Sequence, residues 1–509
     1  MKYFLSGLVF VSGMTSLALE MCASRLLGAY FGTSLFIWGS LIGLILLYLM
    51  IGYFLGGRLA DRYPRPQVLC GITAVAAISI IIIPFVCERI LAGSVTGLEQ
   101  VSVGLFAGSL IGTLLLFAIP VTLLGLVSPF AVRIITREVK ESGRISGSLY
   151  AISTVGSILG AFLPVLWFIP TWGVRRSLII FGVILLASSL WGFVPKRRPV
   201  VAIPLAVLII PMVFVLVVPL GPLKTIPNLI YSQESLYNYI QVTRDNDGTR
   251  ELVLNEGDAV HSIYNPNSTS ILTSWYWDYF LAAPYFNQGF TPNQLKRVGI
   301  IGLAGGTSAR QFTQVYNNVP IDGAEIDPAI VSVARKYFNM NEPNLNVYNQ
   351  DGRTFLAASK HTYGLIAVDA YQQPYIPFQF TTKEFFTQVR SHLSSSGVVA
   401  INTGHTNNDY RLVQAFVNTL STVFPSVYTF NVPGTINTEI IATVQPTSLS
   451  TFQKQMSQFA PDSTMGLLAS EVLPVATRAR PDGGLVFTDN EAPIEQITDQ
   501  LLIDYIVHS

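Results

Sequence analysis

Two short runs in the second half of the chain have the residue types and spacing of a nucleoside-binding site. The first is a glycine-rich run from Gly302 to Thr307, with Gly305 inside it, between a predicted strand and a predicted helix. Small residues there let a ligand approach the backbone, and the N–H groups that begin a helix favour a polar ligand. Glu325, followed by Ile326, ends the next predicted strand roughly 20 residues later, where a carboxylate can accept hydrogen bonds from both ribose hydroxyls.

Two further carboxylates follow the next two predicted strands. Asp351, with Gly352 after it, combines a carboxylate with a tight turn and suits the amino group of an adenine base, and Asp369 ends the fourth strand. Each carboxylate taken singly is equally well explained as a helix cap or a solvated loop acid. Their shared position at successive strand ends favours a nucleoside site instead, because parallel strands bring these ends to one edge of a sheet.

The elements that must position these residues alternate between strand and helix. The predicted strands are 297–302, 322–326, 345–348, 363–369, 397–402, 426–430 and 439–444, with helices that begin at Ser308 and span 328–338. Such alternation predicts a doubly wound, mainly parallel α/β sheet, a Rossmann-like domain of the class I methyltransferase type.

A small β-rich subdomain is expected in front of this sheet. The composition changes near 221–230 from apolar residues to Asn, Thr, Ser, Asp and Tyr, which marks a domain boundary. Two β-rich runs, 238–243 and 251–254, flank Asp245–Gly248, where Asp, Asn and Gly tolerate the positive φ of a hairpin turn. We therefore predict three parts: a membrane bundle at 1–220, a β-rich subdomain at 221–290, and a Rossmann-like domain at 291–509.

The first part is expected to be a multi-pass α-helical membrane bundle. Only 12% of the residues are charged, against roughly 25% in soluble proteins. A helix needs about 20 apolar residues to cross a bilayer, because its backbone polar groups must be satisfied internally there. About seven segments meet that requirement: 4–30, 34–56, 68–87, 102–132, 147–169, 177–194 and 200–220.

The first apolar segment carries two ionisable residues, Glu20 and Arg25. It also lacks a small-residue cleavage site, so we interpret it as a retained helix rather than a signal peptide. We expect Glu20 and Arg25 to pair with each other or to reach the interface, with a polar path for a cationic substrate as the alternative.

Basic residues gather in the loops on one side of the predicted bundle. That side holds Lys2 and the basic residues of 58–65, 133–144 and 196–198. The positive-inside rule places it in the cytoplasm, so that seven spans leave the second half of the chain outside. A ligand made in the cytosol would argue for the opposite placement. We expect a multi-pass protein of the cell membrane and lean towards an external second half.

Charge and cysteine content exclude two further classes of site. The formal net charge of +1 gives no basic excess for binding nucleic acid. The cysteines Cys22, Cys70 and Cys87 lie in the apolar half without metal-ligand spacing. We therefore predict neither a disulfide framework nor a metal site.

Motifs of a definite order run through the second half of the chain. They are Ser235–Ile240, Leu254–Gly257, Tyr276-Trp277-Asp278, Gly302–Arg310, Glu325-Ile326-Asp327, Asp351-Gly352, Thr381–Phe386 and Thr488–Pro493. In order and spacing they resemble the spermidine synthase family, the aminopropyltransferases. The resemblance is in particular to the membrane-embedded bacterial members, a feature of which Thr488–Pro493 resembles, and it covers nearly the whole chain. By this resemblance, Tyr276-Trp277-Asp278, within 221–290, would border the amine site.

The resemblance implies a transferase that uses an adenosyl sulfonium donor and releases methylthioadenosine, with polyamine synthesis as the default. The donor would be decarboxylated S-adenosylmethionine or S-adenosylmethionine, and no prosthetic group is implied. By resemblance, the donor-binding residues would be Asn238, Gly302, Gly305, Glu325, Ile326, Asp351, Gly352 and Asp369. The catalytic positions would be Tyr276, Asp278, Asp369, Gln372 and Gln373.

Several positions depart from the family pattern. Spermidine-forming members carry an Asp where this chain has Gly305, and a second Asp in the run where it has Gln372 and Gln373. Glutamine cannot accept a proton near neutral pH, so the usual general base is missing. Fewer acids near the donor tail also remove the repulsion that would reject ordinary S-adenosylmethionine. The family's His is Trp277 here, which with Tyr276 could hold a cation over its ring.

Two alternatives to aminopropyl transfer stay open. The same nucleoside site would serve a methyltransferase, or an enzyme that cleaves S-adenosylmethionine without an external acceptor. A non-catalytic protein, in which nucleoside or polyamine binding is coupled to transport or sensing by the helices, is the second. The expected partners are the lipid bilayer, a small-molecule nucleoside and an amine, with a homodimer left open and no nucleic acid.

Overall fold

The chain forms two compact units in a computed structural model. The structure describes residues 2–32, 35–96, 104–136, 138–193, 220–255, 260–371, 375–406 and 409–508. The first unit comprises Met1–Ile226, Ser232–Tyr239 and Asn255–Gly257, and the second comprises Pro227–Tyr231, Ile240–Leu254 and Asp258–Ser509. The predicted division at 220 and 290 stays a prediction.

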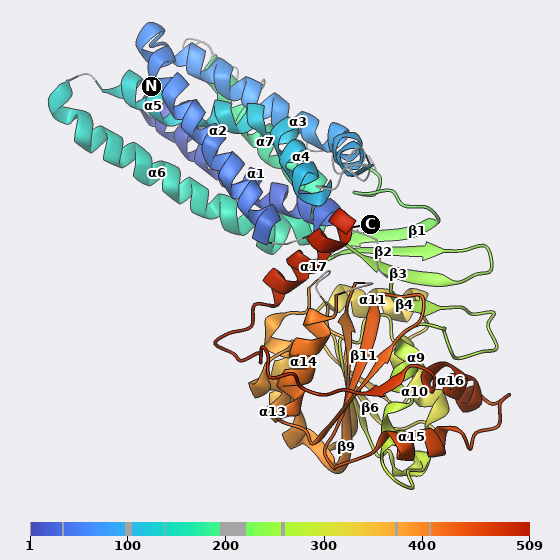
Figure 1. Ribbon diagram of the computed structural model, residues 1–509. Coiled ribbons are helices and arrows are strands. Elements are labelled where there is room, and N and C mark those ends of the chain that lie inside the picture. The colour runs from blue at the N-terminus through green and yellow to red at the C-terminus, as the bar shows by residue number, and fades with distance from the viewer. Residues whose placement is uncertain are drawn as a thin grey trace. The chain divides into compact units, whose positions relative to one another are not determined.

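The first unit is a bundle of long helices (Figure 1). They are α1 Lys2–Phe31, α2 Leu35–Arg62, α3 Pro66–Thr96, α4 Gly104–Gly125, α5 Val127–Ile135, α6 Ser142–Leu163 and α7 Ile169–Trp191, with short turns η1 Val139–Glu141 and η2 Pro164–Phe168. Among the described residues, five stretches are long and apolar enough to cross a membrane: Tyr3–Phe31, Ile37–Arg62, Pro66–Ser94, Gly108–Ile135 and Val139–Trp191. Except for residue 220, the predicted segment 200–220 lies outside the described residues.

The fifth apolar stretch reverses its direction at Gly173. The backbone of Gly173 has a φ of 81°, which an L side chain rarely adopts. Ile145 near the start of α6 shares an apolar cluster with Leu5, and Gly192 just after α7 packs against Phe4. Both ends of the stretch therefore lie near the start of α1, so that α6 runs out along the bundle and α7 runs back. This stretch contains the predicted segment 147–169 and most of the predicted segment 177–194.

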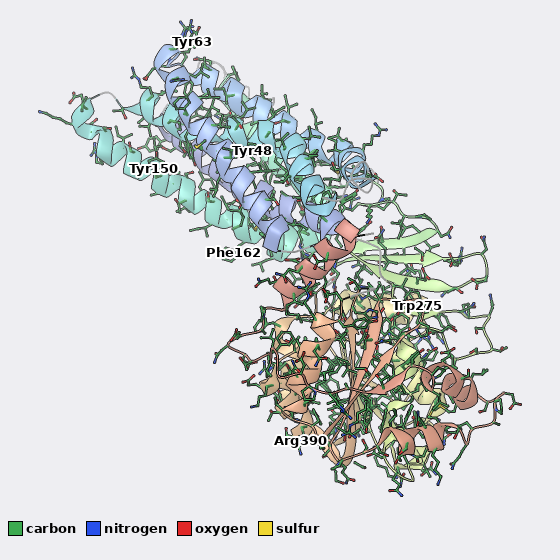
Figure 2. All side chains as sticks on the ribbon, viewed as in Figure 1. Tyr48, Tyr63, Tyr150, Phe162, Trp275 and Arg390 are labelled. Atoms are coloured by element: carbon green, nitrogen blue, oxygen red, sulfur yellow. The ribbon has the colours of Figure 1, made fainter. Side chains whose placement is uncertain are left out.

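The outer surface of the bundle is apolar. Tyr150 and Phe162 lie along α6 and are 56% and 61% exposed (Figure 2). Tyr48 of α2 is buried instead. A surface of this kind is unfavourable in water and suits contact with lipid chains.

A four-stranded antiparallel sheet precedes the larger sheet in the sequence. Its strands are β1 Leu229–Glu234, β2 Tyr239–Arg244, β3 Arg250–Leu254 and β4 Val260–Tyr264, in that order. The predicted hairpin is confirmed, because Gly248 has a φ of 94° and its N–H donates to the Asp245 carbonyl at 3.0 Å. Val242 and Leu252 pack against Phe338, which follows α11 (Pro328–Tyr337).

The second unit is built on an eight-stranded sheet in the order β12-β10-β11-β9-β8-β5-β6-β7. The strands are β5 Val298–Ile301, β6 Ile321–Ala324, β7 Leu345–Tyr348, β8 Tyr363–Val368, β9 Leu393–Gly404, β10 Ser426–Asn431, β11 Asn437–Thr443 and β12 Ala476–Arg478. The run from β7 to β9 is parallel, and β11, β10 and β12 add antiparallel pairs at one edge. The Rossmann-like prediction is confirmed.

Helices cover both faces of this sheet (Figure 1). Apart from α11, they are α9 Trp277–Phe280, α10 Thr307–Val315, α12 Gly352–Ala358, α13 Lys383–His392, α14 Arg411–Ser421, α15 Leu449–Met456, α16 Thr464–Val472 and α17 Ile494–His508, with short turns η3 Ala283–Phe286, η4 Pro292–Gln294 and η5 Phe378–Phe380. One apolar core lies between the sheet and α9, α10, α15 and α16, and a second lies between the sheet and α12, α13 and α14. Strands buried on both faces explain the nearly continuous apolar runs in the sequence.

Candidate functional site

The glycine-rich run forms a tight turn between β5 and α10. Gly302 has a φ of 89°, and a Cβ atom there would overlap the carbonyl oxygen of Asp369. Ala304 has a φ of 47°, an uncommon conformation for a residue with a side chain. Its N–H donates to Oε2 of Glu325 at 2.9 Å. The glycine-rich loop therefore packs closely against the ends of both neighbouring strands, β6 and β8.

Glu325 is buried and held at the end of β6. Its Oε1 accepts the N–H of Asp327 at 3.0 Å, while Oε2 accepts that of Ala304, so both oxygens have a fixed direction. Burial raises the pKa of Glu325 to about 7. Ile326 beside it is 42% exposed, although it follows a buried strand. The carboxylate and the neighbouring apolar side chain together suit a sugar and a base.

Asp351 caps α12 at the end of β7. Its Oδ1 accepts the N–H groups of Arg353 and Thr354, each at 3.0 Å. The cap interpretation is therefore correct for one oxygen of Asp351. Gly352 begins the helix so close to β5 that a Cβ atom would overlap the side chain of Ile301.

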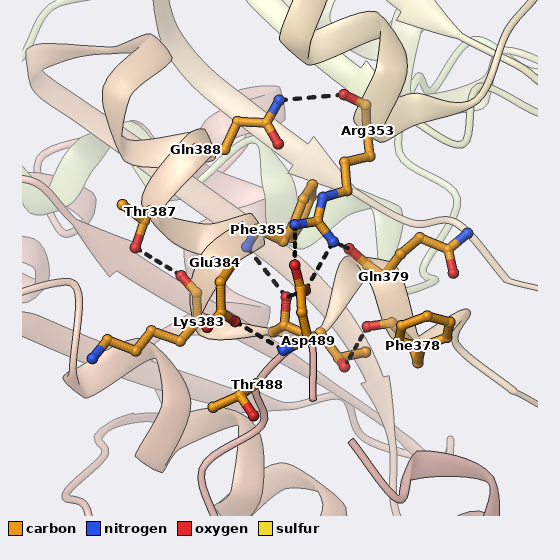
Figure 3. Close-up of polar contacts among 12 residues, drawn as sticks. Arg353, Phe378, Gln379, Lys383, Glu384, Phe385, Thr387, Gln388, Thr488 and Asp489 are labelled. Carbon is orange, nitrogen blue, oxygen red and sulfur yellow. Dashed lines mark hydrogen bonds and ion pairs between the residues drawn. The ribbon is translucent and has the colours of Figure 1, made fainter. Parts of the chain in front are cut away.

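Arg353 connects the Asp351 turn to two distant motifs. It forms two hydrogen bonds with Asp489, at 2.9 and 2.7 Å (Figure 3). Thr382 donates to the same carboxylate at 2.6 Å, and the N–H of Asp489 donates to Glu384 at 3.0 Å. The motifs Thr381–Phe386 and Thr488–Pro493, which the sequence analysis singled out separately, therefore form one cluster beside α12.

Asp369 lies at the end of β8, at the centre of a second polar cluster. Its Oδ2 accepts the indole N–H of Trp277 at 3.1 Å, and its Oδ1 accepts the amide of Asn402 at 3.0 Å. The hydroxyl of Tyr276 is a third partner. Burial is the main cause that raises the pKa of Asp369 to about 6. The structure thus makes Trp277 a hydrogen-bond donor, a role that the sequence analysis did not foresee.

The carboxylate of Asp278 accepts hydrogen bonds mainly from the loop that precedes it. Its carboxylate accepts the N–H groups of Thr273 and Ser274, the hydroxyl of Thr273 and the amide of Gln311. Its side chain is fully buried, and burial is the first cause that raises its pKa to about 6. These contacts anchor the segment before α9 and so position Tyr276 and Trp277.

Three predicted site residues belong to the first unit or lie outside the described residues. Asn238 belongs to the first unit, where its side-chain oxygen accepts the amide of Asn255 at 3.1 Å. Gln372 and Gln373 lie outside the described residues. Their predicted roles stay predictions.

Glu439 and Asn402 were not singled out from the sequence. Asn402 is held by Asn437, whose amide donates to its side-chain oxygen at 2.8 Å. Glu439 stands opposite Asn402 in the β9–β11 register and is 0% exposed. The available signal was an acid within the otherwise apolar and hydroxyl-bearing strand Asn437–Thr443. In the described ranges, no group of three or more His, Cys, Asp or Glu is arranged to hold a metal ion.

Comparison with known proteins identifies the domain around these residues. Residues 287–455 match the spermine/spermidine synthase domain family. A probable polyamine aminopropyl transferase of Bifidobacterium longum is 35% identical over 298 residues, which cover 54% of this chain and 65% of that protein. A polyamine aminopropyltransferase of Vibrio vulnificus is 29% identical over 219 residues, which cover 42% of this chain and 71% of that protein.

Among solved structures, a probable spermidine synthase from Corynebacterium glutamicum aligns with 52% of this chain and 97% of its own, at 18% identity and a TM-score of 0.41. The sequence match overlaps the glycine-rich run, Glu325, Asp351 and Asp369. The chain therefore contains a spermine/spermidine synthase domain, which its residues 287–455 form.

Proposed function

We propose that the chain is a membrane-bound, spermidine synthase-like transferase that uses an adenosyl sulfonium donor and releases methylthioadenosine. The observation that carries the proposal is the orientation of Glu325, whose oxygens are fixed by two backbone N–H groups beside the glycine-rich turn. A carboxylate held in this way can accept ribose hydroxyls without first being ordered. The family of residues 287–455 supports the same donor chemistry.

The proposed reaction is a displacement at a carbon atom next to the sulfonium. The nitrogen lone pair of an amine forms the new C–N bond while the C–S bond breaks. The electron pair of the C–S bond stays on the sulfur and neutralises it. The amine proton passes to a base, and a neutral thioether nucleoside leaves. The protein needs mainly to position the two reactants and to keep the attacking amine deprotonated.

The helical unit supports attachment to a membrane. Its five long apolar stretches and the exposed apolar side chains of α6 fit a lipid environment. We propose that these helices anchor the transferase domain in the cell membrane.

Binding of methylthioadenosine to the detergent-solubilised full chain tests the nucleoside site. We expect Glu325→Gln to weaken binding by about 1.5–3 kcal/mol, because a charged acceptor of the ribose hydroxyls is lost. Wild-type affinity should rise from about pH 6 to about pH 8, since burial raises the pKa of Glu325 to about 7 and the ionised form is the better acceptor.

The matched control is Glu471→Gln, a partly buried glutamate on α16 of the same unit. It should leave the affinity for methylthioadenosine unchanged. If Glu325→Gln and Glu471→Gln bind equally well, the nucleoside site lies elsewhere.

Product analysis by mass spectrometry separates aminopropyl transfer from the alternatives. Wild-type protein is incubated with decarboxylated S-adenosylmethionine and 1,4-diaminobutane, and in parallel with S-adenosylmethionine. Methylthioadenosine together with an extended polyamine supports the proposal. S-adenosylhomocysteine identifies a methyltransferase, and methylthioadenosine without any extended amine identifies cleavage of the donor.

A further inference from the structure

Three polar side chains form a row across neighbouring strands at the edge of the sheet that carries the site. Asp369 follows β8, Asn402 lies on β9 next to it, and Glu439 lies on β11 directly opposite Asn402. Side chains at directly opposed positions of adjacent strands point to the same face. Asn402 donates to Asp369, so the row faces the side of the sheet that α9 covers.

Glu439 is the unexplained member of this row. It is 0% exposed, and neither of its oxygens has a hydrogen-bond partner among the described residues. The amide of Asn402 is committed to Asp369 and its oxygen to Asn437. Leaving a buried polar group without a partner costs about 1–3 kcal/mol, so its retention calls for a partner that arrives later.

The charged surroundings of Glu439 within the described residues are acidic. Burial, and then the charge of Asp369, raise the pKa of Glu439 well above its ordinary value. The titratable side chains around the pair are phenols: Tyr276 just before α9, Tyr279 within α9, and Tyr371 after β8. Burial raises the pKa of Tyr276 and of Tyr371 further, so both stay neutral.

The two carboxylates of the row differ in exposure. Asp369 and Tyr371 are partly exposed, while Glu439 lies deeper. Tyr276 and Trp277 form an aromatic wall with ring centroids 4.4 Å apart. Acidic and aromatic groups together recognise an ammonium group, by charge and by contact with the ring faces.

We propose that Asp369 and Glu439 together bind a primary alkylammonium group, and that Glu439 supplies the acid missing from the position of Gln372 and Gln373. This inference rests on the proposed function and adds a residue to it. Burial and the charge of Asp369 favour the protonated form of Glu439 in the empty protein, and the proton is released when the ammonium group enters. In the transfer step it accepts a proton from the attacking nitrogen, so that the amine is neutral when the C–N bond forms.

Equilibrium binding of 1,4-diaminobutane to the full chain saturated with methylthioadenosine tests the proposal. Glu439→Gln should weaken diamine binding about tenfold or more, because a buried charge-assisted contact is lost. Wild-type binding should release about one proton, measured by calorimetry in buffers of different ionisation enthalpy, and the variant should release none. Affinity should also rise with pH up to neutrality in the wild type, since deprotonation of the pair favours the cation.

Two controls keep the result interpretable. Glu471→Gln removes a carboxylate whose charge reaches Tyr279 without being part of the row, and it should bind the diamine normally. Glu439→Asp keeps the charge and should recover at least part of the binding. If Glu439→Gln also loses methylthioadenosine, recovery of diamine binding in Glu439→Asp supports the proposal, and its absence overturns it.

A second experiment decides whether the ammonium group belongs to the diamine or to the aminopropyl tail of the donor. If Glu439 holds the aminopropyl tail of the donor, Glu439→Gln weakens decarboxylated S-adenosylmethionine but not methylthioadenosine. Unchanged affinity of Glu439→Gln for both the diamine and the decarboxylated donor overturns the proposal. Normal binding of methylthioadenosine in that case leaves the nucleoside site standing. Absence of turnover with normal diamine binding would instead count against the proposed function alone.

Discussion

The space around Gly305 explains why this position does not carry the Asp of the family pattern. Its N–H donates to the hydroxyl of Ser262 on β4 at 2.8 Å. A Cβ atom at Gly305 would lie 2.6 Å from the Cβ of Ser262 and 2.9 Å from its hydroxyl oxygen. The loop and β4 have therefore approached each other to a distance that a side chain at 305 does not allow.

We expect Gly305→Asp alone to destabilise the protein without increasing its preference for the decarboxylated donor. The double variant Gly305→Asp/Ser262→Gly should restore most of the stability, because it removes the obstructing side chain. It should also raise the ratio of kcat/KM for the decarboxylated over the ordinary donor by about tenfold, since a new carboxylate repels the donor's own. Thermal melting and donor competition measure the two effects.

Ser262→Gly alone is the control for the lost hydroxyl contact, and it should change donor preference little. A Gly305→Asp variant that melts at the wild-type temperature would show that β4 yields easily. The steric explanation would then be wrong.

The sequence was informative about residues that follow strands and uninformative about residues inside them. Glu325 and Asp369 were found because their positions at strand ends imply a shared edge. Glu439 was not singled out because one acid within a strand does not by itself indicate a site, and only the pairing of β9 with β11 places it beside Asn402. Such long-range pairing depends on the register between the two strands, which cannot be read from a single sequence.

Arg353 and Asp489 show how segments far apart in the chain support one turn. The side chains are 27% and 39% exposed, and the bidentate geometry holds α12 to the segment before α17. The hydroxyl of Thr382 also donates a hydrogen bond to the Asp489 carboxylate, and Thr382 is the N-cap residue of α13. The Asp351 turn therefore rests on contacts with residues more than a hundred positions away.

We expect Asp489→Ala to lower the free energy of unfolding by about 1–2 kcal/mol, because two charge-assisted hydrogen bonds to Arg353 are lost on a partly exposed surface. Affinity for methylthioadenosine should fall by a few fold, through displacement of Asp351. Denaturant unfolding and calorimetry measure these effects.

Asp504→Ala is the matched control. Asp504 also pairs with an arginine, Arg411, at 2.6 Å, but both side chains are about half exposed. Its loss should change stability by less than about 1 kcal/mol and leave nucleoside binding intact. Equal effects of the two substitutions would contradict a special role for the Asp489 contact.

The helices illustrate a similar limit of sequence patterns. Apolar length located six of the expected segments, because a bilayer-spanning helix has a composition of its own. The same pattern did not show that α6 and α7 are joined by a helical turn, η2, and reverse at Gly173. One glycine with a positive φ decides that path, and glycines are frequent in this part of the chain.

The two ends of the helical unit differ in charge and in what they connect to. Leu5, Ala60 and Ile145 share one apolar cluster, which places the start of α1 with the α2–α3 and α5–α6 connections. Arg133 pairs with Asp61 at this end at 2.8 Å. The basic residues that the structure describes in the loops 58–65 and 133–144 therefore gather at one end of the bundle.

The chain leaves the bundle at the opposite end. Tyr30, next to the end of α1, donates its hydroxyl to the carbonyl of Leu223 at 2.8 Å. Arg175, just after the reversal at Gly173, donates to the carbonyl of Leu220 at 2.8 Å. The positive-inside rule predicts that the basic end faces the cytoplasm and that the end at which the chain leaves the bundle faces outward.

We therefore expect a cysteine at Asn246→Cys, in the β2–β3 turn, to react with a membrane-impermeant thiol reagent on intact cells. The three native cysteines are buried in the helical unit and would be replaced first. The control is Arg65→Cys in the same background, which should react only after lysis because it lies at the basic end. The reverse pattern would show that the charge rule fails for this protein.

The place of Glu439 inside a strand also affects the entropy of ligand binding. Its strand, β11, is hydrogen-bonded to β10 on one side and to β9 on the other. Fixing the backbone of one residue costs about 1–2 kcal/mol, and a loop acid would incur this cost each time a ligand enters. At Glu439 the sheet has met that cost during folding. In the proposed ammonium site, the spacing between the carboxylates of Asp369 and Glu439 is therefore set before an amine binds. We expect the site to distinguish amines by how well they fit that spacing.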